Sequence, residues 1–254
     1  KMEGLTVELL SKRLRHQRTQ RTQFSMDEYQ KLLKVSRSRI KKGRGTRIKF
    51  DRERLHHFCI FMVGTGLRVD EALKLEWEDI RCIDRERVVN RQATETIVSA
   101  YGKDFLSQLE RYYLQINVGI SKSRPHTAYG TGSAYFAYQN LIKLYTSNPQ
   151  FNCKVGEGTI FKLHSFREGL NSLLDEADLK FEKLGDSRVK RDSKSFRHTF
   201  IQFMLNKGMS STAIAKMCGT STEMIDKYYT SNMALDTMMD TFNKVKGGHL
   251  KIVS

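Results

Sequence analysis

The spacing of apolar residues on the two sides of Gly64-Thr-Gly66 constrains the fold more than any other feature of this sequence. Residues 55–63 carry apolar side chains at helical intervals before the glycines, and residues 69–75 do so after them. Because glycine ends helices and permits sharp turns, the pattern predicts two helices joined by a tight turn. Arg68 is therefore expected at the start of the second helix.

Other helical patterns and one hairpin recur along the chain. Ser25-Met-Asp-Glu28 is a capping box that predicts a helix from there to about Ile40, and Thr220-Ser-Thr-Glu223 predicts another at Thr220. Residues 112–118 have strand composition and 127–129 are expected to return beside them, with Lys122 at the hairpin tip. Further helices are predicted at 103–111, 133–145 and 165–179, with two short ones between 195 and 219; the rest of 78–110 stays open.

The charge of the chain indicates a polyanionic partner. The formal net charge is +16, and residues 1–54 hold 17 Lys and Arg against 6 Asp and Glu, which places +11 of it there. Such a flank attracts nucleic acid by counterion release, with an anionic membrane surface as the rival. Without a membrane-spanning run or a signal-peptide core, a cytoplasmic protein with no membrane partner is expected. For the basic loop 41–47, a solvated surface and a DNA phosphate contact are equally open.

Cysteine and histidine spacing indicates neither disulfides nor a metal centre. The four cysteines are scattered without a CxxC pair, so reduced thiols are expected. The seven histidines show no ligand spacing. No metal site and no cofactor are predicted.

Arg68, Arg197 and Tyr229 are together suited to cutting a phosphodiester. Two guanidinium groups can hold the phosphate oxygens as these gain negative charge in the transition state. A tyrosine beside them could attack the phosphorus and become a phosphotyrosine. Lys122 is the candidate general acid for the leaving 5′ oxygen. The bond energy stays in the intermediate, so neither ATP nor a metal ion is required.

Two sequence boxes carry a family resemblance. They are Thr65-Gly-Leu-Arg68-Val-Asp-Glu71 with Trp77-Glu-Asp-Ile80, and Ser195-Phe-Arg197-His-Thr-Phe200 followed by Gly219 and Tyr229-Thr230. Over residues 22–232 the chain resembles the tyrosine recombinase, or phage integrase, family. The resemblance implies an α+β, mainly α, catalytic domain with a small antiparallel sheet, which cuts and rejoins DNA through a 3′-phosphotyrosine. Lys122-Ser-Arg-Pro-His-Thr127 is similar to the family's hairpin lysine motif.

Two positions depart from the commonest pattern of that family. Lys194 stands where histidine is usual; it can still donate to a phosphate but is a poor base at neutral pH. Thr220 stands where histidine or tryptophan is usual, and as a helix start it could donate to a phosphate oxygen. Both are candidate site residues, and the acceptor of the tyrosine proton is left open.

The spacing also separates two adjacent tyrosines. Tyr229 stands nine residues after Thr220, as the family's nucleophile does, whereas Tyr228 is expected to pack or to touch DNA. Glu71 and His198 match family positions and are interpreted as structural, with Glu71 orienting Arg68 and His198 satisfied in the core.

Two other functions compete with recombination. Residues 200–229 also resemble a helix-turn-helix, which would make the protein a non-catalytic DNA-binding regulator. A type IB topoisomerase-like relaxing enzyme would share the chemistry without joining paired sites. Neither the box around Arg68 nor the spacing to Tyr229 follows from the regulator hypothesis.

The resemblance divides the chain into three parts. Residues 1–22 are expected to be a basic linker leading from an N-terminal DNA-binding domain, residues 23–230 the catalytic domain, and residues 231–254 a tail helix. The implied partners are double-stranded attachment-site DNA and further copies of the chain in a tetrameric synapse. Packing of the tail on its own domain and docking on a neighbouring protomer are both open.

Overall fold

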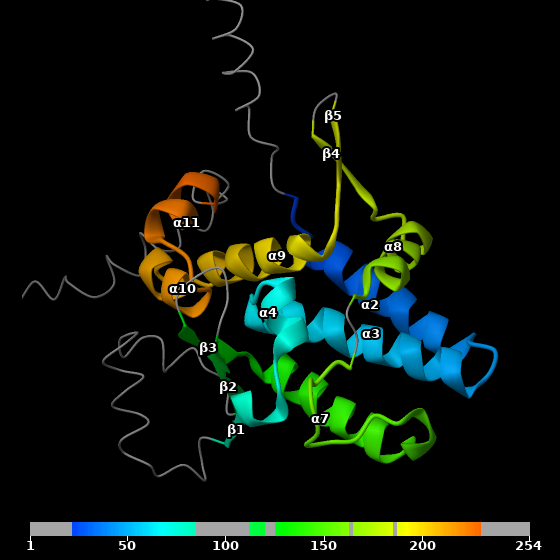
Figure 1. The fold of residues 1–254 in the computed structure, drawn as a ribbon. Coiled ribbons are helices and arrows are strands. Elements are labelled where there is room, and N and C mark those ends of the chain that lie inside the picture. Colours follow the sequence, from blue (N-terminus) through cyan, green and yellow to red (C-terminus); the bar gives the residue numbers. More distant parts are fainter. Residues whose placement is uncertain (1–21, 85–111, 120–124, 163–164, 185–186, 230–254) are drawn as a thin grey trace, which may run out of the picture.

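A computed structural model describes residues 22–84, 112–119, 125–162, 165–184 and 187–229 of the chain (Figure 1). The helices are α2 (Met26–Lys41), α3 (Thr46–Thr65), α4 (Val69–Lys74), α7 (Gly132–Thr146), α8 (Arg167–Glu176), α9 (Ser193–Asn206), α10 (Ser211–Met217) and α11 (Thr222–Tyr229), with 3-10 turns η1 (Trp77–Asp79) and η2 (Pro149–Phe151). The strands are β1 (Ile80–Asp84), β2 (Tyr112–Val118), β3 (His126–Gly130), β4 (Phe181–Leu184) and β5 (Ser187–Lys190). This mainly helical architecture with small antiparallel sheets confirms the predicted fold class.

The first helix begins where its capping box predicts. The Ser25 hydroxyl accepts from the Glu28 amide at 3.1 Å, and the Glu28 carboxylate accepts from the Ser25 amide at 2.9 Å. Two amides of the first turn that lack helical partners are thereby satisfied. The helix continues to Lys41, one residue beyond the expected end.

The turn between α3 and α4 depends on glycine at position 66. Gly66 caps α3 with a φ of +66°, and its amide donates to the Met62 carbonyl at 3.0 Å. A Cβ added at Gly66 would lie 2.1 Å from the Phe200 ring on α9. The position therefore requires glycine for its left-handed conformation and for the close approach of α9.

A three-stranded antiparallel sheet in the order β1-β2-β3 lies beside α7. The hairpin of β2 and β3 was predicted; it pairs Leu114 with Gly130 and Val118 with His126. Strand β1, which pairs Ile80 with Ile116, falls in the segment whose structure the sequence leaves open. The β4–β5 hairpin was not predicted either, and the helix expected at 103–111 lies outside the described residues.

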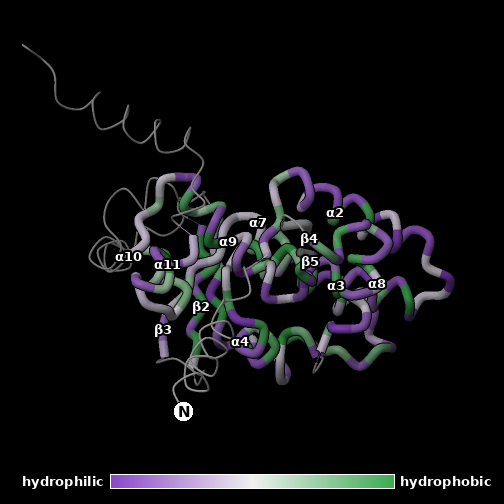
Figure 2. Tube along the Cα trace, turned by 90° about the horizontal axis from the view of Figure 1, so that it is seen from above, coloured by the Kyte–Doolittle hydropathy of each residue, from purple (hydrophilic) through white to green (hydrophobic). Residues whose placement is uncertain are grey.

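Two hydrophobic clusters form the core, and α9 joins them. The larger one combines buried residues of α2, α3, α7, α8 and the three-stranded sheet, and includes Phe196 of α9. The smaller one packs α9, α10 and α11 on Tyr113 and Tyr129, and includes Phe200 of α9. Figure 2 shows hydrophilic segments along the outer edge near α2 and α8. Because α9 is fixed in both clusters, side chains on its remaining face have defined positions.

We expect the substitution Gly66→Ala to destabilise the fold more than the matched change Gly208→Ala. Both glycines have positive φ, +66° and +82°, but a Cβ at Gly208 meets nothing within 4 Å. Gly208→Ala should cost about 1–2 kcal/mol of backbone strain. Gly66→Ala adds the clash with Phe200, for a total above about 3 kcal/mol. Urea unfolding measures both; equal losses would contradict the account of this turn.

Candidate active site

Arg68 precedes α4 and is held at both ends of its guanidinium group. Its Nη1 donates to Glu71 Oε1 at 2.7 Å, and its Nη2 donates to the Gly219 carbonyl at 2.9 Å. Glu71 Oε2 also accepts from the Arg68 amide at 2.8 Å. The Glu71 side chain is 1% exposed and that of Arg68 is 32% exposed, which confirms Glu71 as the group that orients the arginine.

Arg197 projects from α9 toward the same two turns. Its Nη1 donates to the Gly66 carbonyl at 2.9 Å, and its Nη2 donates to the Cys218 carbonyl at 2.6 Å. These two bonds use two of the five N–H donors of the guanidinium group. Arg197 is half-buried. Within the described part of the chain its other three N–H donors are left to bind an anion.

The carbonyls that hold the arginines lie at the ends of two helices. Gly66 caps α3, and Cys218 caps α10, where Gly219 follows with a φ of +56°. The last carbonyls of a helix lack helical partners and carry partial negative charge. The two arginines satisfy those carbonyls and bring together residues far apart in the sequence. Arg68 and Arg197 thus meet at one place, as their predicted roles require.

Tyr229 ends α11 and is 3% exposed. Its hydroxyl forms a hydrogen bond with Nδ1 of His198 on α9, and the two ring centroids lie 5.6 Å apart. Tyr228 is half-buried and packs on the smaller cluster. The prediction that His198 is satisfied in the core is wrong in its location, because His198 is only half-buried and contacts the expected nucleophile.

Lys194, Arg197 and His198 lie on one face of α9. They stand at positions i, i+3 and i+4, which are neighbours on a helical surface. Lys194 is exposed, and its ammonium makes no hydrogen bond or ion pair within the described segments. The face therefore carries a solvent-accessible cation beside the bound arginine.

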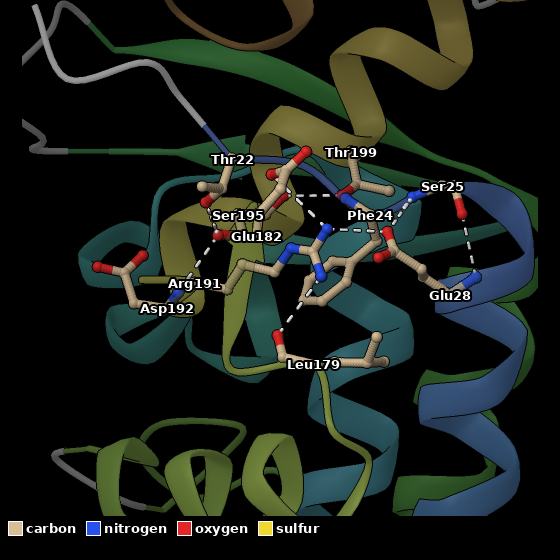
Figure 3. Close-up of polar contacts among 10 residues, drawn as sticks. All are labelled: Thr22, Phe24, Ser25, Glu28, Leu179, Glu182, Arg191, Asp192, Ser195 and Thr199. Atoms are coloured by element: carbon tan, nitrogen blue, oxygen red, sulfur yellow. Dashed lines mark hydrogen bonds and ion pairs between the residues drawn. The ribbon is translucent and has the colours of Figure 1, made fainter. Parts of the chain in front are cut away.

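A buried ionic network anchors the start of α9 (Figure 3). The Arg191 side chain is 2% exposed and bonds Glu28 at 2.9 Å, with Glu182 at 3.6 Å. Two hydroxyls of α9 bind the segment before α2: Ser195 contacts the Thr22 hydroxyl at 2.8 Å, and Thr199 accepts from the Phe24 amide at 2.9 Å. Residues 22–28 and β4 thereby fix the helix that carries Lys194 and Arg197.

Thr220 lies in the turn between α10 and α11. Its amide donates to the Ala215 carbonyl at 2.9 Å, the bond that closes a glycine-ended helix. The predicted capping box at Thr220 is wrong by one residue. Helix α11 starts at Thr222, and the Ser221 hydroxyl accepts from the Met224 amide at 3.3 Å. Thr220 still adjoins Gly219, which Arg68 holds.

Lys122 lies outside the described residues, but the base of its hairpin is described. His126 opens β3, and a Cβ added at Gly219 would lie 2.5 Å from the His126 ring. The hairpin base is therefore beside the turn that binds Arg68. His126 is not among the predicted site residues, and its signal in the sequence is its place in the segment similar to the hairpin lysine motif.

No group of three or more His, Cys, Asp or Glu side chains in the described part of the chain could hold a metal ion. No described helix is long and apolar enough to cross a membrane.

Comparison with known proteins identifies relatives of this arrangement. The model of the phage integrase family matches residues 22–234. XerH site-specific recombinase bound to difH substrate is 16% identical, with a TM-score of 0.54, over 83% of this chain and 50% of that one. XerA recombinase is 15% identical (TM-score 0.54), over 89% of this chain and 64% of that one. The Tn1549 transposon integrase with right end DNA is 15% identical (TM-score 0.54), over 91% and 67%.

These structural matches establish the tyrosine recombinase catalytic-domain fold. The chain spans about half the length of the XerH chain. A search of curated proteins by sequence gave no significant match.

We expect Arg191→Ala to destabilise the protein by roughly 2 kcal/mol, because it removes the buried guanidinium group that bonds the partly exposed carboxylates of Glu28 and Glu182. Arg188→Ala is the matched control, since Arg188 is exposed on β5 and lies 4.8 Å from the Phe181 ring centroid. That change should cost less than about 1 kcal/mol. Urea denaturation measures both, and a small loss for Arg191→Ala would show that the network does not anchor α9.

Proposed function

Because the chain belongs to the phage integrase family, we propose that it is a site-specific DNA recombinase that cuts and rejoins strands through a covalent 3′-phosphotyrosine. One observation carries the proposal. Arg68 and Arg197, which lie 129 positions apart in the sequence, are held at adjacent turns beside the helix that ends in Tyr229. Two arginines beside a tyrosine are expected in a site that binds one phosphate and attacks its phosphorus atom.

The proposed reaction uses the described site residues together with Lys122, which lies outside the described part of the chain. The guanidinium groups hold the nonbridging phosphate oxygens as these become more negative. The Tyr229 oxygen attacks phosphorus, and the bond from phosphorus to the 5′ oxygen breaks. Lys122 supplies the proton to that 5′ oxygen, while Lys194 and Thr220 donate to the phosphate. A 5′ hydroxyl from another strand then attacks the phosphotyrosine and releases Tyr229. The energy of the broken phosphodiester bond is kept in the phosphotyrosine, so the proposed reaction requires neither ATP nor a metal ion.

The burial of Tyr229 requires a movement before attack. A side chain that is 3% exposed does not reach a phosphate on a duplex. Helix α11 has eight residues and buries only Ile225 and Tyr229, so few apolar contacts hold it in place. DNA binding is proposed to shift α11 and bring the tyrosine to the arginines.

A cationic cleft lies at the other end of α3. It has a volume of about 870 Å³. Its charged lining residues are Arg39, Arg47, Asp51, Arg52, Arg54, Arg167 and Glu168, which gives five arginines against two carboxylates. A second cavity shares Ser165, Phe166 and Arg167 with it and reaches Asp192 and Ser193 at the start of α9. This continuity supports contact of the basic loop 41–47 and the cleft with the DNA backbone.

The partners and boundaries follow the same proposal. Double-stranded attachment sites are the proposed substrate, with a tetrameric synapse of the chain on DNA in the cytoplasm. The expected linker at 1–21 and tail helix at 231–254 lie outside the described residues, so the three-part division stays a prediction. No observation favours a helix-turn-helix regulator, because that function does not use the contact of Arg68 with Gly219.

A pool of nicked suicide duplexes with randomised sequence tests the proposed function. Wild-type protein should give a DNA adduct that survives denaturing detergent, and sequencing the trapped DNA identifies the preferred site. Tyr229→Phe should abolish the adduct, while Tyr228→Phe, the matched control, should retain it. Arg68→Ala and Arg197→Ala should each slow cleavage by about 100-fold or more. An adduct that persists in Tyr229→Phe, or none with wild type, would refute the proposal.

The cleft makes a separate binding prediction. Arg52→Gln with Arg167→Gln removes two cleft cations that form no ion pair in the described part of the chain. DNA affinity should fall, and the slope of log affinity against log salt should decrease by roughly 2, about one for each lost phosphate contact. Lys143→Gln with Lys154→Gln removes the same charge outside the cleft and should change the slope little. Fluorescence anisotropy measures both, and equal slopes would exclude the cleft from the DNA surface.

A further inference from the structure

The hydrogen bond between His198 Nδ1 and the Tyr229 hydroxyl joins the expected nucleophile to an imidazole. We propose that His198 is a catalytic residue that takes the Tyr229 proton during strand cleavage and returns it during rejoining. The inference rests on the proposed function, whose nucleophile it uses. This role identifies the acceptor of the tyrosine proton, which the sequence alone leaves open.

The chemistry of the neighbouring groups favours His198 over the other candidates. A phenol has a free pKa near ~10 and must lose its proton as it attacks, whereas a free imidazole is largely neutral at pH 7 and can accept one. Lys194 carries an ammonium and Thr220 a hydroxyl, and neither is a base at that pH. Both stand where the family resemblance leads one to expect histidine or tryptophan. The fold brings the imidazole of His198 into contact with the phenol.

The position of His198 on α9 is well defined. Its neighbours Phe196 and Thr199 are buried at 0% exposure, and Arg197 is held through two carbonyls. The base and a phosphate-binding arginine are therefore adjacent residues on one anchored helix. An acceptor fixed beside Arg197 is within reach of a phenol that moves toward the arginines, and holding it there costs little further entropy.

The proton balance closes over the full reaction. With Nδ1 unprotonated and Nε2 protonated, the phenol donates to Nδ1. On attack, the Tyr229 oxygen bonds to phosphorus, its proton passes to Nδ1, and His198 becomes an imidazolium. The 5′ oxygen leaves with a proton from the general acid, for which Lys122 is the candidate. In the reverse direction, the incoming 5′ hydroxyl returns a proton to that acid, and the imidazolium reprotonates Tyr229 as the phosphotyrosine bond breaks.

A different role for the same contact is a restraint. Tyr229 is 3% exposed, so His198 could merely hold the phenol inside the protein until DNA arrives. The two roles predict opposite effects. Loss of a proton acceptor slows cleavage, whereas loss of a restraint leaves cleavage unchanged or accelerates it.

The test compares His198→Ala and His198→Gln with wild type, on the suicide duplex recovered from the randomised pool. Glutamine can keep a hydrogen bond to the phenol but cannot take up its proton. Both variants should form the adduct about 100-fold more slowly than wild type. Added imidazole should restore part of the rate of His198→Ala, while sodium chloride at equal ionic strength should not. Tyr229→Phe, the control, should stay inactive with imidazole.

Each outcome decides the proposal. Wild-type rates in either variant, faster cleavage, or a loss that imidazole does not reverse in protein with wild-type circular dichroism would overturn it. Nitrogen NMR of DNA-free protein covers the case in which the alanine variant does not fold. There Tyr229→Phe should shift the His198 Nδ1 resonance, and an unchanged resonance would overturn the proposal. If wild type itself forms no adduct, the recombinase function fails first and this role fails with it.

Discussion

The binding of two guanidinium groups to the carbonyls that end α3 and α10 is the interaction on which the rest of this site depends. Arg68 bonds the Gly219 carbonyl, and Arg197 bonds those of Gly66 and Cys218. These contacts join the turn after α3, helix α9 and the turn before α11. Because the C-terminal ends of helices carry partial negative charge, the fold stabilises two cations close together before any phosphate binds. Preorganised charge of this kind is what phosphoryl transfer requires.

Glycine and the buried ion pair make that geometry possible. Gly66 and Gly219 permit left-handed turns and admit the Phe200 and His126 rings where a Cβ would clash. Arg191, with Glu28 and Glu182, fixes the other end of α9. The arginine site is thus held from both ends of one helix, whereas α11 buries only Ile225 and Tyr229. This difference fits a site in which the two arginines are fixed and Tyr229 on α11 can move.

Local signals predicted much of this structure, and long-range contacts account for what they missed. The capping box at Ser25 and the glycine turn at Gly66 act within a few residues, so the sequence predicts them. Strand β1 is decided by pairing with β2, and the bond from Arg191 to Glu28 spans 163 positions. The cap of α11 is Ser221 and not the predicted Thr220, because the Thr220 amide bonds the last turn of α10. His198 could be selected only once Tyr229 was placed beside it.

The most direct measurement is mass spectrometry of the covalent adduct after exhaustive nuclease digestion. The account predicts one peptide that carries a nucleotide 3′-phosphate on the Tyr229 oxygen, with Tyr228 unmodified. The Tyr228→Phe variant should give the same modified site. A nucleotide on Tyr228 or on another side chain would contradict the central claim that Arg68 and Arg197 hold the phosphate that Tyr229 attacks.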